Sequence, residues 1–278
     1  MSAVLTPSAP TAAAKAPPLK VTQGRVVRSE STKFRSLRST MYTLLVAVVL
    51  MIGIGAVFSA VNASQYHTFS VSAKATFQPI STSLTGVVFA VVAFGVLGVL
   101  LMSGEYSTGM IRASLTVVPR RLPVLWAKLV VFSSAIFSIS LVASFVSFFV
   151  GQALLSSHHL NVAITAPGAL RSVIGAALYV TVAGLIGVSL GALFRNTAAG
   201  IATFAAVFFV LPPLTGLLPA SISNHLAPYL PSNAGGSLWG GSATVHNALS
   251  PWTGFALLCG YAVVLIAAAA WRLRRADA

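Results

Sequence analysis

The sequence predicts an all-α integral membrane protein with six transmembrane helices, an amphipathic surface helix before the first and a cytoplasmic helix between the second and third. Of its 278 residues, 56% are hydrophobic and 7% are charged, whereas soluble domains carry about 25% charged residues. The apolar residues form runs that match the roughly 20 residues needed to cross a bilayer. The Lys and Arg residues fall between these runs, as in proteins whose helices are oriented by basic loops.

The formal charge of +14 does not indicate nucleic-acid binding. A nucleic-acid interface gathers Lys and Arg on one surface with polar or aromatic readers between them, and no such cluster occurs here. The single cysteine, Cys259, lies inside an apolar run, which excludes a disulfide framework and a thiolate metal cluster within this chain.

Residues 1–24 are rich in Ala and Pro and have neither a basic start nor a continuous apolar core. We expect a disordered cytoplasmic tail there and not a cleavable signal peptide. Residues 25–278 are expected to form one six-span domain.

The sequence just before the first span alternates basic and apolar side chains: Lys33, Phe34, Arg35, Leu37 and Arg38. This pattern favours a helix lying along the membrane surface. A basic stretch that is merely solvated is the alternative.

The six expected spans cover approximately residues 41–61, 84–102, 129–151, 172–194, 198–219 and 252–271. None of them contains Asp, Glu or His, which argues against a carrier coupled to an ion gradient. Lys128 precedes the third span, where we expect its ammonium to reach the water while its stem lies in lipid. Residues 212–251 contain several prolines and are expected to form short re-entrant or surface helices.

The distribution of basic residues predicts the topology. Fifteen of the 17 Lys and Arg residues fall on the side of the amino terminus, and only Lys74 and Arg171 fall on the other. Positive residues accumulate in cytoplasmic loops. We therefore expect a multi-pass protein of the cell membrane with both termini in the cytoplasm.

No enzyme active site is predicted. The five histidines all lie in expected outer loops, and the adjacent His158 and His159 lack the helical spacing of metal ligands. The chain has no phosphate-binding loop of the GxxxxGK[ST] type. We expect no catalytic, cofactor or metal site in this chain.

Two pairs of glycines have helical spacing: Gly95 with Gly98, and Gly187 with Gly191. Small residues at such intervals allow close approach of helices in membranes. The sequence leaves open whether these glycines pack within the bundle or form a dimer face.

The loop after the second span has the clearest motif. Tyr106, Met110, Ala113 and Val117 have the spacing of one face of a helix, and Pro119 would end that helix. The loop reads Glu105-Tyr106-Ser107-Thr108-Gly109-Met110-Ile111-Arg112 and ends at Pro119-Arg120-Arg121, ahead of Lys128.

With the pre-span run at residues 29–40, this loop resembles the permease subunits of ATP-binding-cassette exporters that have six spans and a separate ATPase chain. Residues 229–235 and 249–252 are similar to an actinobacterial branch of that class. The resemblance covers roughly residue 28 to the end of the chain.

The resemblance implies that the loop forms a coupling helix docked on the ATPase. The residues it implicates in coupling are Glu105, Tyr106, Thr108, Gly109, Arg112, Pro119, Arg120 and Arg121. The alternative for Glu105 is a local role, capping the helix and neutralising nearby Arg.

The function implied is export of an amphipathic or hydrophobic substrate such as a drug, a peptide antibiotic or a lipid. The expected partners are two ATPase subunits, which would hold ATP and Mg, a second permease subunit that is identical or a close paralogue, and the bilayer. The alternatives are an ATP-independent carrier and a membrane subunit that anchors or regulates a partner without transport.

Overall fold

The computed structural model describes residues 22–36, 38–107, 121–242 and 245–275, and the regular elements in these ranges are all helices. Six of their helical segments are long and apolar enough to cross a membrane. They are Arg38–Thr68, Val87–Tyr106, Leu122–Ser156, Ala169–Phe194, Thr197–Leu217 and Pro251–Arg275. The predicted class, a helical protein with six potential membrane spans, is confirmed, and it indicates a multi-pass membrane protein.

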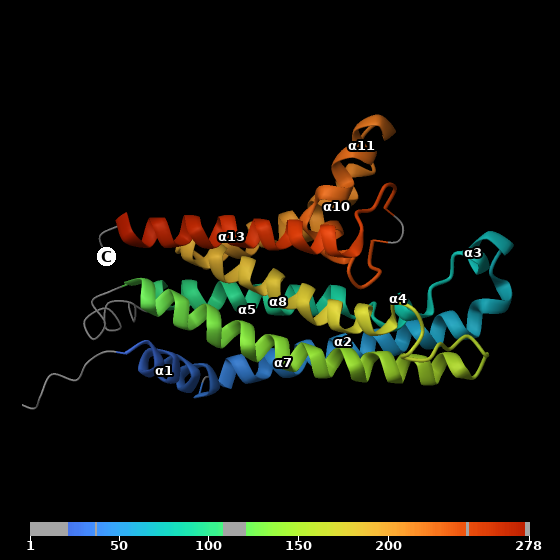
Figure 1. The fold of residues 1–278 in the computed structure, drawn as a ribbon, viewed down its shortest axis with the longest axis horizontal. Helices are drawn as coiled ribbons and strands as arrows, with labels where there is room; N and C mark the ends of the chain where they lie inside the picture. The colour runs from blue at the N-terminus through green and yellow to red at the C-terminus, as the bar shows by residue number, and fades with distance from the viewer. Residues whose placement is uncertain (1–21, 37, 108–120, 243–244, 276–278) are drawn as a thin grey trace, which may run out of the picture.

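The long helices run side by side along the longest axis (Figure 1). They are α1 (Gln23–Ser36), α2 (Arg38–Gln65), α5 (Val87–Ser107), α7 (Arg121–Ser156), α8 (Ala169–Phe194) and α13 (Pro251–Arg275). The end of the bundle at which α1 and the last turns of α13 lie is called the α1 end, and the opposite one the α3 end. Shorter elements complete the chain: η1 (Tyr66–Thr68), α3 (Val71–Ala75), α4 (Pro79–Ser83), α9 (Thr197–Ala205), η2 (Ala206–Val210), α10 (Leu211–Thr215), α11 (Ala220–Leu226), η3 (Ala227–Tyr229) and α12 (Pro231–Gly236).

The helices extend beyond the predicted spans. Helix α7 begins at Arg121 and not near residue 129, because residues 122–127 are also apolar. Pro123 lies in the first turn, where its missing N–H breaks no helical hydrogen bond. Helix α5 likewise continues to Ser107. As a result Glu105 and Lys128, which lie outside the expected spans 84–102 and 129–151, belong to the two apolar helices that could cross the membrane.

Helix α8 forms the centre of the bundle, with 83% of its most apolar window buried. Two of its glycines face α5: a Cβ on Gly187 would collide with the carbonyl of Gly95, and a Cβ on Gly191 with that of Val99. A Cβ on Gly98 would in turn meet α8. The paired glycines therefore serve packing within the bundle, one of the two interpretations left open by their spacing.

The fifth span is broken. Helix α9 packs against α5 and α8, with Phe204 filling the space left by Gly95. A π-helical turn, η2, follows, and Pro212 and Pro213 in α10 cannot supply backbone N–H groups. Beyond this point α10 and α11 turn away from the bundle (Figure 1). The short helices expected in residues 212–251 are present as α10, α11, η3 and α12.

Neutral hydrogen bonds hold the α3 end together. The amide of Gln152 in α7 donates to Ser83 Oγ at 2.8 Å and to the Pro79 carbonyl at 3.1 Å, and its Oε1 accepts from the Val162 N–H at 2.8 Å. Ser147 Oγ donates to the Ser83 carbonyl at 2.7 Å. One helix therefore fastens both α4 and the connection that leads to α8.

Candidate functional site

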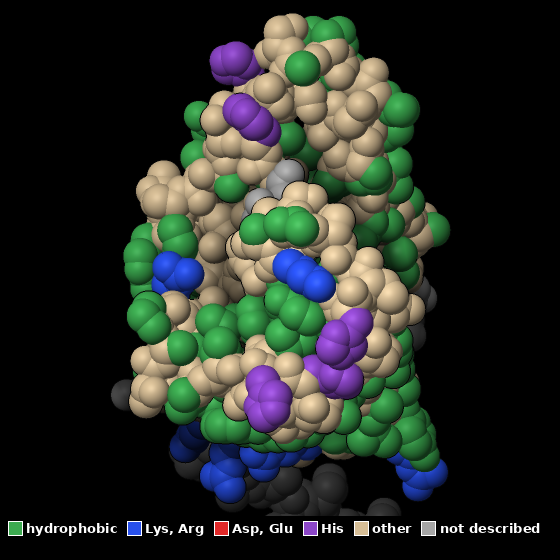
Figure 2. Space-filling view, turned by 90° about the vertical axis from the view of Figure 1, so that its right-hand side faces the viewer, with side chains coloured by type: hydrophobic (Ala, Val, Ile, Leu, Met, Phe, Trp, Pro, Cys, Tyr) green, Lys and Arg blue, Asp and Glu red, His purple; other side chains and the backbone are tan. Residues whose placement is uncertain are grey.

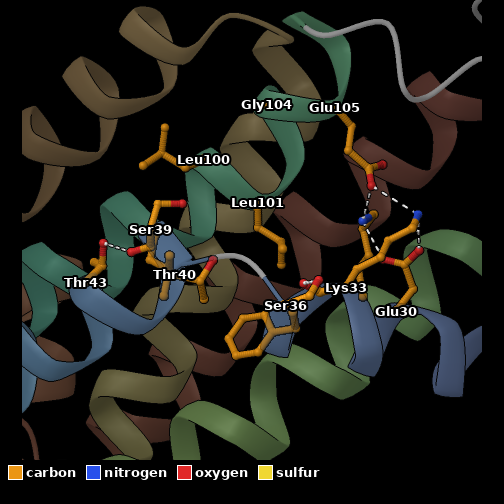
Figure 3. A pocket seen from close by; sticks show the side chains of 13 residues that line it. Glu30, Lys33, Ser36, Ser39, Thr40, Thr43, Leu100, Leu101, Gly104 and Glu105 are labelled. Atoms are coloured by element: carbon orange, nitrogen blue, oxygen red, sulfur yellow. Dashed lines mark hydrogen bonds and ion pairs between the residues drawn. The ribbon is translucent and has the colours of Figure 1, made fainter.

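Three helices bring charged side chains together at the α1 end (Figure 3). Glu30 and Lys33 lie one turn apart on α1, so both project from the same face of that helix. Glu105 lies near the end of α5, and Lys128 lies in the second turn of α7. We call these four residues the ion cluster.

Lys128 occupies the middle of the ion cluster. Its Nζ lies 2.6 Å from Glu30 Oε2 and 2.7 Å from Glu105 Oε1. Lys33 Nζ lies 2.9 Å from Glu30 Oε1 and 3.7 Å from Glu105 Oε1. Two acids and two bases therefore join α1, α5 and α7 with no net charge.

The prediction that Lys128 reaches water is wrong. Its side chain is only 2% exposed, because α1 covers the start of α7 and supplies Glu30 as a partner. Burying an ammonium is tolerable only where carboxylates compensate its charge. The apolar surroundings and the two short contacts together explain why this lysine lies inside the protein.

The cluster perturbs the ionisation of its members on α1. Burial alone would raise the pKa of Glu30, but the charges and hydrogen bonds of Lys128 and Lys33 outweigh it and hold that pKa below its ordinary value of 4.5. Burial likewise works to lower the pKa of Lys33, and its contacts with Glu30 and Glu105 outweigh burial, so the pKa is raised above 10.5. Both shifts favour the charged pair.

A cavity of about 340 Å³ lies at the ion cluster, whose four residues all line it, and its walls come from α1, α2, α5 and α7. Leucines of α5, including Leu100 and Leu101, form its apolar side (Figure 3). Hydroxyl side chains of α2, including Thr40 and Thr43, face them. Its size falls at the lower end of the range for small-molecule pockets.

The residues of the expected surface helix differ in how far they are buried. Phe34 is 4% exposed and packs edge-on against Phe132 of α7, with ring centroids 6.5 Å apart. Arg35 and Arg38 are exposed, and Leu37 is not among the described residues. Helix α1 begins at Gln23, just inside the predicted tail of residues 1–24. Residues 1–21 of that tail lie outside the described part.

Of the residues assigned to coupling, the structure describes three. Glu105 belongs to the ion cluster, the Tyr106 ring lies 4.9 Å beneath the Arg195 guanidinium, and Arg121 is the first residue of α7. Thr108, Gly109, Arg112, Pro119 and Arg120 lie outside the described residues, as does most of the predicted coupling helix.

Sequence reasoning missed the pairing that defines the site. Lys128 binds Glu30 across 98 residues of sequence, and no local pattern encodes such a contact. The sequence nevertheless contained an indication of this pairing. Glu30, Glu105 and Lys128 all lie near the ends of expected helices on the same side of the membrane.

The histidines lie at the α3 end, where the rings of His67 and His158 meet with centroids 5.7 Å apart. Among the described residues, no three of His, Cys, Asp and Glu gather as metal ligands would.

Comparison of the chain with protein-family models and with curated proteins gave no match.

Proposed function

We propose that this chain is the permease subunit of an ATP-binding-cassette exporter and that its α1 end faces the cytoplasm. The six apolar helices supply the number of spans that such a subunit needs. The basic residues of α1, the end of α8 and the end of α13 gather at the α1 end, which accords with cytoplasmic placement in the cell membrane.

The ion cluster is the observation that carries this proposal. It joins α5 and α7 beside the two positions, Ser107 and Arg121, between which residues 108–120 run. It also ties both helices to α1. A displacement of that loop by a partner would be transmitted through the cluster to three helices at once, as a rigid-body movement.

The proposed assembly contains two permease subunits and two ATPase subunits. ATP and Mg would be held by the ATPase subunits, and this chain would perform no bond chemistry. The substrate would be amphipathic or hydrophobic. The cavity beside the ion cluster, with leucines on one side and hydroxyls on the other, is chemically suited to such a molecule.

The direct test is affinity purification of the tagged chain in mild detergent, with identification of bound proteins by mass spectrometry. We expect an ATP-binding-cassette subunit at about one copy per permease, and Arg112→Glu should lower its recovery about tenfold by reversing a charge in the proposed docking loop. Lys74→Glu is the matched control, because it reverses a charge at the α3 end. Repeated recovery of the chain alone from active membranes would overturn the proposal.

An ion-coupled carrier is the second candidate, because Glu105 and Lys128 lie within membrane helices. Ionisable groups at such positions often bind and release transported ions. Reconstitution of the chain alone in vesicles separates the two functions. Substrate movement driven by a proton gradient without ATPase would favour the carrier, and movement only with ATPase and ATP would favour the exporter.

A further inference from the structure

The cavity at the ion cluster is open on one side. Leu97 and Thr40, which line it, are buried. Other lining residues reach the surface: Leu100 of α5 is 41% exposed, and Ser36 and Ser39 are exposed as well. Ser36 is the last residue of α1, and Ser39 belongs to the first turn of α2. The opening therefore lies between α5 and the place where α1 ends and α2 begins (Figure 3).

Both sides of this opening continue into exposed apolar surface. On α5, Leu100 shares a helical face with Phe89 and Val92, which are also exposed. On α2, Val46 follows Thr43 by one turn and is exposed. Both helices are long and apolar enough to cross a membrane, and the exposed apolar face of such a helix contacts lipid. The cavity therefore opens sideways toward the bilayer.

The lining of the cavity changes from apolar to charged along α5. Leu97, Leu101 and Gly104 follow one another at helical spacing, and Glu105 comes directly after them. On the other side, α2 presents hydroxyl side chains, including Thr43. A molecule that fills the cavity thus meets leucines on one side, hydroxyls on the other and charges at one end. This lining fits an amphiphile, with its apolar chain beside the leucines and its polar head beside the ion cluster.

The charge of the ion cluster limits the chemistry of the head. Its two ammonium groups and two carboxylates pair with one another and sum to zero. A head with a net charge would bring an uncompensated charge beside Lys128, whose side chain is 2% exposed, and such a charge is costly to bury. Figure 2, which faces the α3 end, shows Lys, Arg and His side chains there but no acidic ones among the described residues, so this compensation belongs to the α1 end. Hydroxyl groups, which both donate and accept hydrogen bonds, suit the lining best.

We propose that this cavity takes up a neutral, hydroxyl-bearing amphiphile with a single apolar chain directly from the membrane. The opening between α5 and the start of α2 is the entrance, so the molecule arrives sideways and not from the aqueous phase. A volume of about 340 Å³, at the lower end for small-molecule pockets, suits one chain and not a whole two-chain lipid. The role of this molecule as a transported substrate rests on the proposed exporter function, whereas its binding does not.

Photolabelling tests the binding without an ATPase. The purified full chain is reconstituted in phosphatidylcholine vesicles with a monoacylglycerol that carries a diazirine in its chain, and the attachment sites are identified by mass spectrometry. We expect saturable labelling of the lining segments of α2 and α5 that unlabelled monoacylglycerol competes away. An amine and a sulfonate with the same chain should label these segments at least about tenfold less. Labelling that rises without saturation on all lipid-facing helices alike would overturn the proposal.

Variants locate the binding in the cavity. Leu101→Trp should reduce the saturable labelling about tenfold, because the larger side chain fills the space. Val263→Trp is the matched control, since Val263 is 63% exposed on α13, and it should leave the labelling unchanged. Thr43→Val keeps the shape of the side chain and removes a hydroxyl, so the labelling should fall severalfold. Equal labelling in wild type and Leu101→Trp would overturn the proposal. Disulfide-linked dimers of Leu100→Cys in a Cys259→Ser background would also overturn it, because they would assign the opening to a second copy of the chain.

The binding proposal and the exporter proposal fail separately. Recovery of the chain alone in the affinity purification would remove the exporter function and leave the saturable labelling in place. Loss of saturable labelling from a chain that still recovers an ATPase would remove the binding site and leave the exporter function in place.

Discussion

The two ends of the bundle are held together by different interactions. At the α1 end, charged side chains of α1, α5 and α7 form a buried neutral cluster. At the α3 end, an amide and hydroxyls fasten α7 to α4 through uncharged hydrogen bonds, and Arg171 lines a cavity whose described lining contains no acid. Among the described residues, the ion pairs between side chains therefore all lie in this one cluster, beside the loop proposed to receive a partner.

The largest effect is expected for Lys128→Met. The variant removes the central cation and leaves Glu30 and Glu105 buried with only the partly exposed Lys33, so stability should fall by about 3–5 kcal/mol. Thermal unfolding in detergent measures the loss. Adding Glu105→Gln to the variant should recover part of it, because one unpaired charge disappears. If Lys128→Met unfolded at the same temperature as the Lys74→Met control, the ion cluster would not contribute to stability.

A smaller loss is expected at the α3 end for Gln152→Ala. The change leaves the Val162 N–H without its acceptor and removes a donor to Ser83 Oγ, which keeps its own bond to the Pro79 carbonyl. The expected cost is about 1–3 kcal/mol. Because these bonds are neutral, the loss should not depend on salt. Gln65→Ala, at an exposed position that ends α2, serves as control and should shift stability by at most about 0.5 kcal/mol. Equal losses in the two variants would show that the Gln152 contacts contribute nothing.

The smallest effect is expected from a change of pH alone, without mutation. The pKa of Glu30 is lower in the folded protein than its ordinary 4.5, so its contribution to stability is complete above pH 4.5 and is lost as the pH falls below that value. The pKa of Lys33 is raised above 10.5, so its contribution is complete below pH 10.5 and is lost as the pH rises further. The attachment of α1 should therefore be strongest between these limits.

Spin labels on α1 and α7 would report this attachment. We expect the distance distribution to broaden below pH 4.5, while labels on α4 and α7 at the α3 end keep theirs. Glu30→Gln should remove the acid-dependent change at the α1 end. Identical behaviour of both ends across the acid range would refute the distinction between them.

The fold was predictable because length and apolar composition decide whether a helix can cross a bilayer, and these properties are local. The boundaries were less predictable. Lys128 marked a span end in the sequence only because a lysine was assumed to need water, and the tertiary contact with Glu30 removed that need. The π-helical turn before Pro212 was not predictable either, since the run at residues 198–219 contains no charged residue and reads as one span.

The candidate site was predicted in part. Glu105 was identified from the loop motif, but its partners were not, because they come from α1 and α7 through packing that no spacing rule describes. The cavity at the start of α8 is a further example. Arg171 and Trp239 are separated by a long stretch of sequence, and only the folded arrangement brings both to the lining of one cavity, of about 270 Å³, at the α3 end.

The glycine contacts between α5 and α8 have a consequence for movement. Helices slide past each other across interdigitating side chains that can change rotamer. At Gly187 and Gly191 that layer is missing, because each glycine faces the backbone of α5 directly. We therefore expect α5 and α8 to turn as one body in a rearrangement, and independent movement to be easier for the broken fifth span, of which only 17% of the most apolar window is buried.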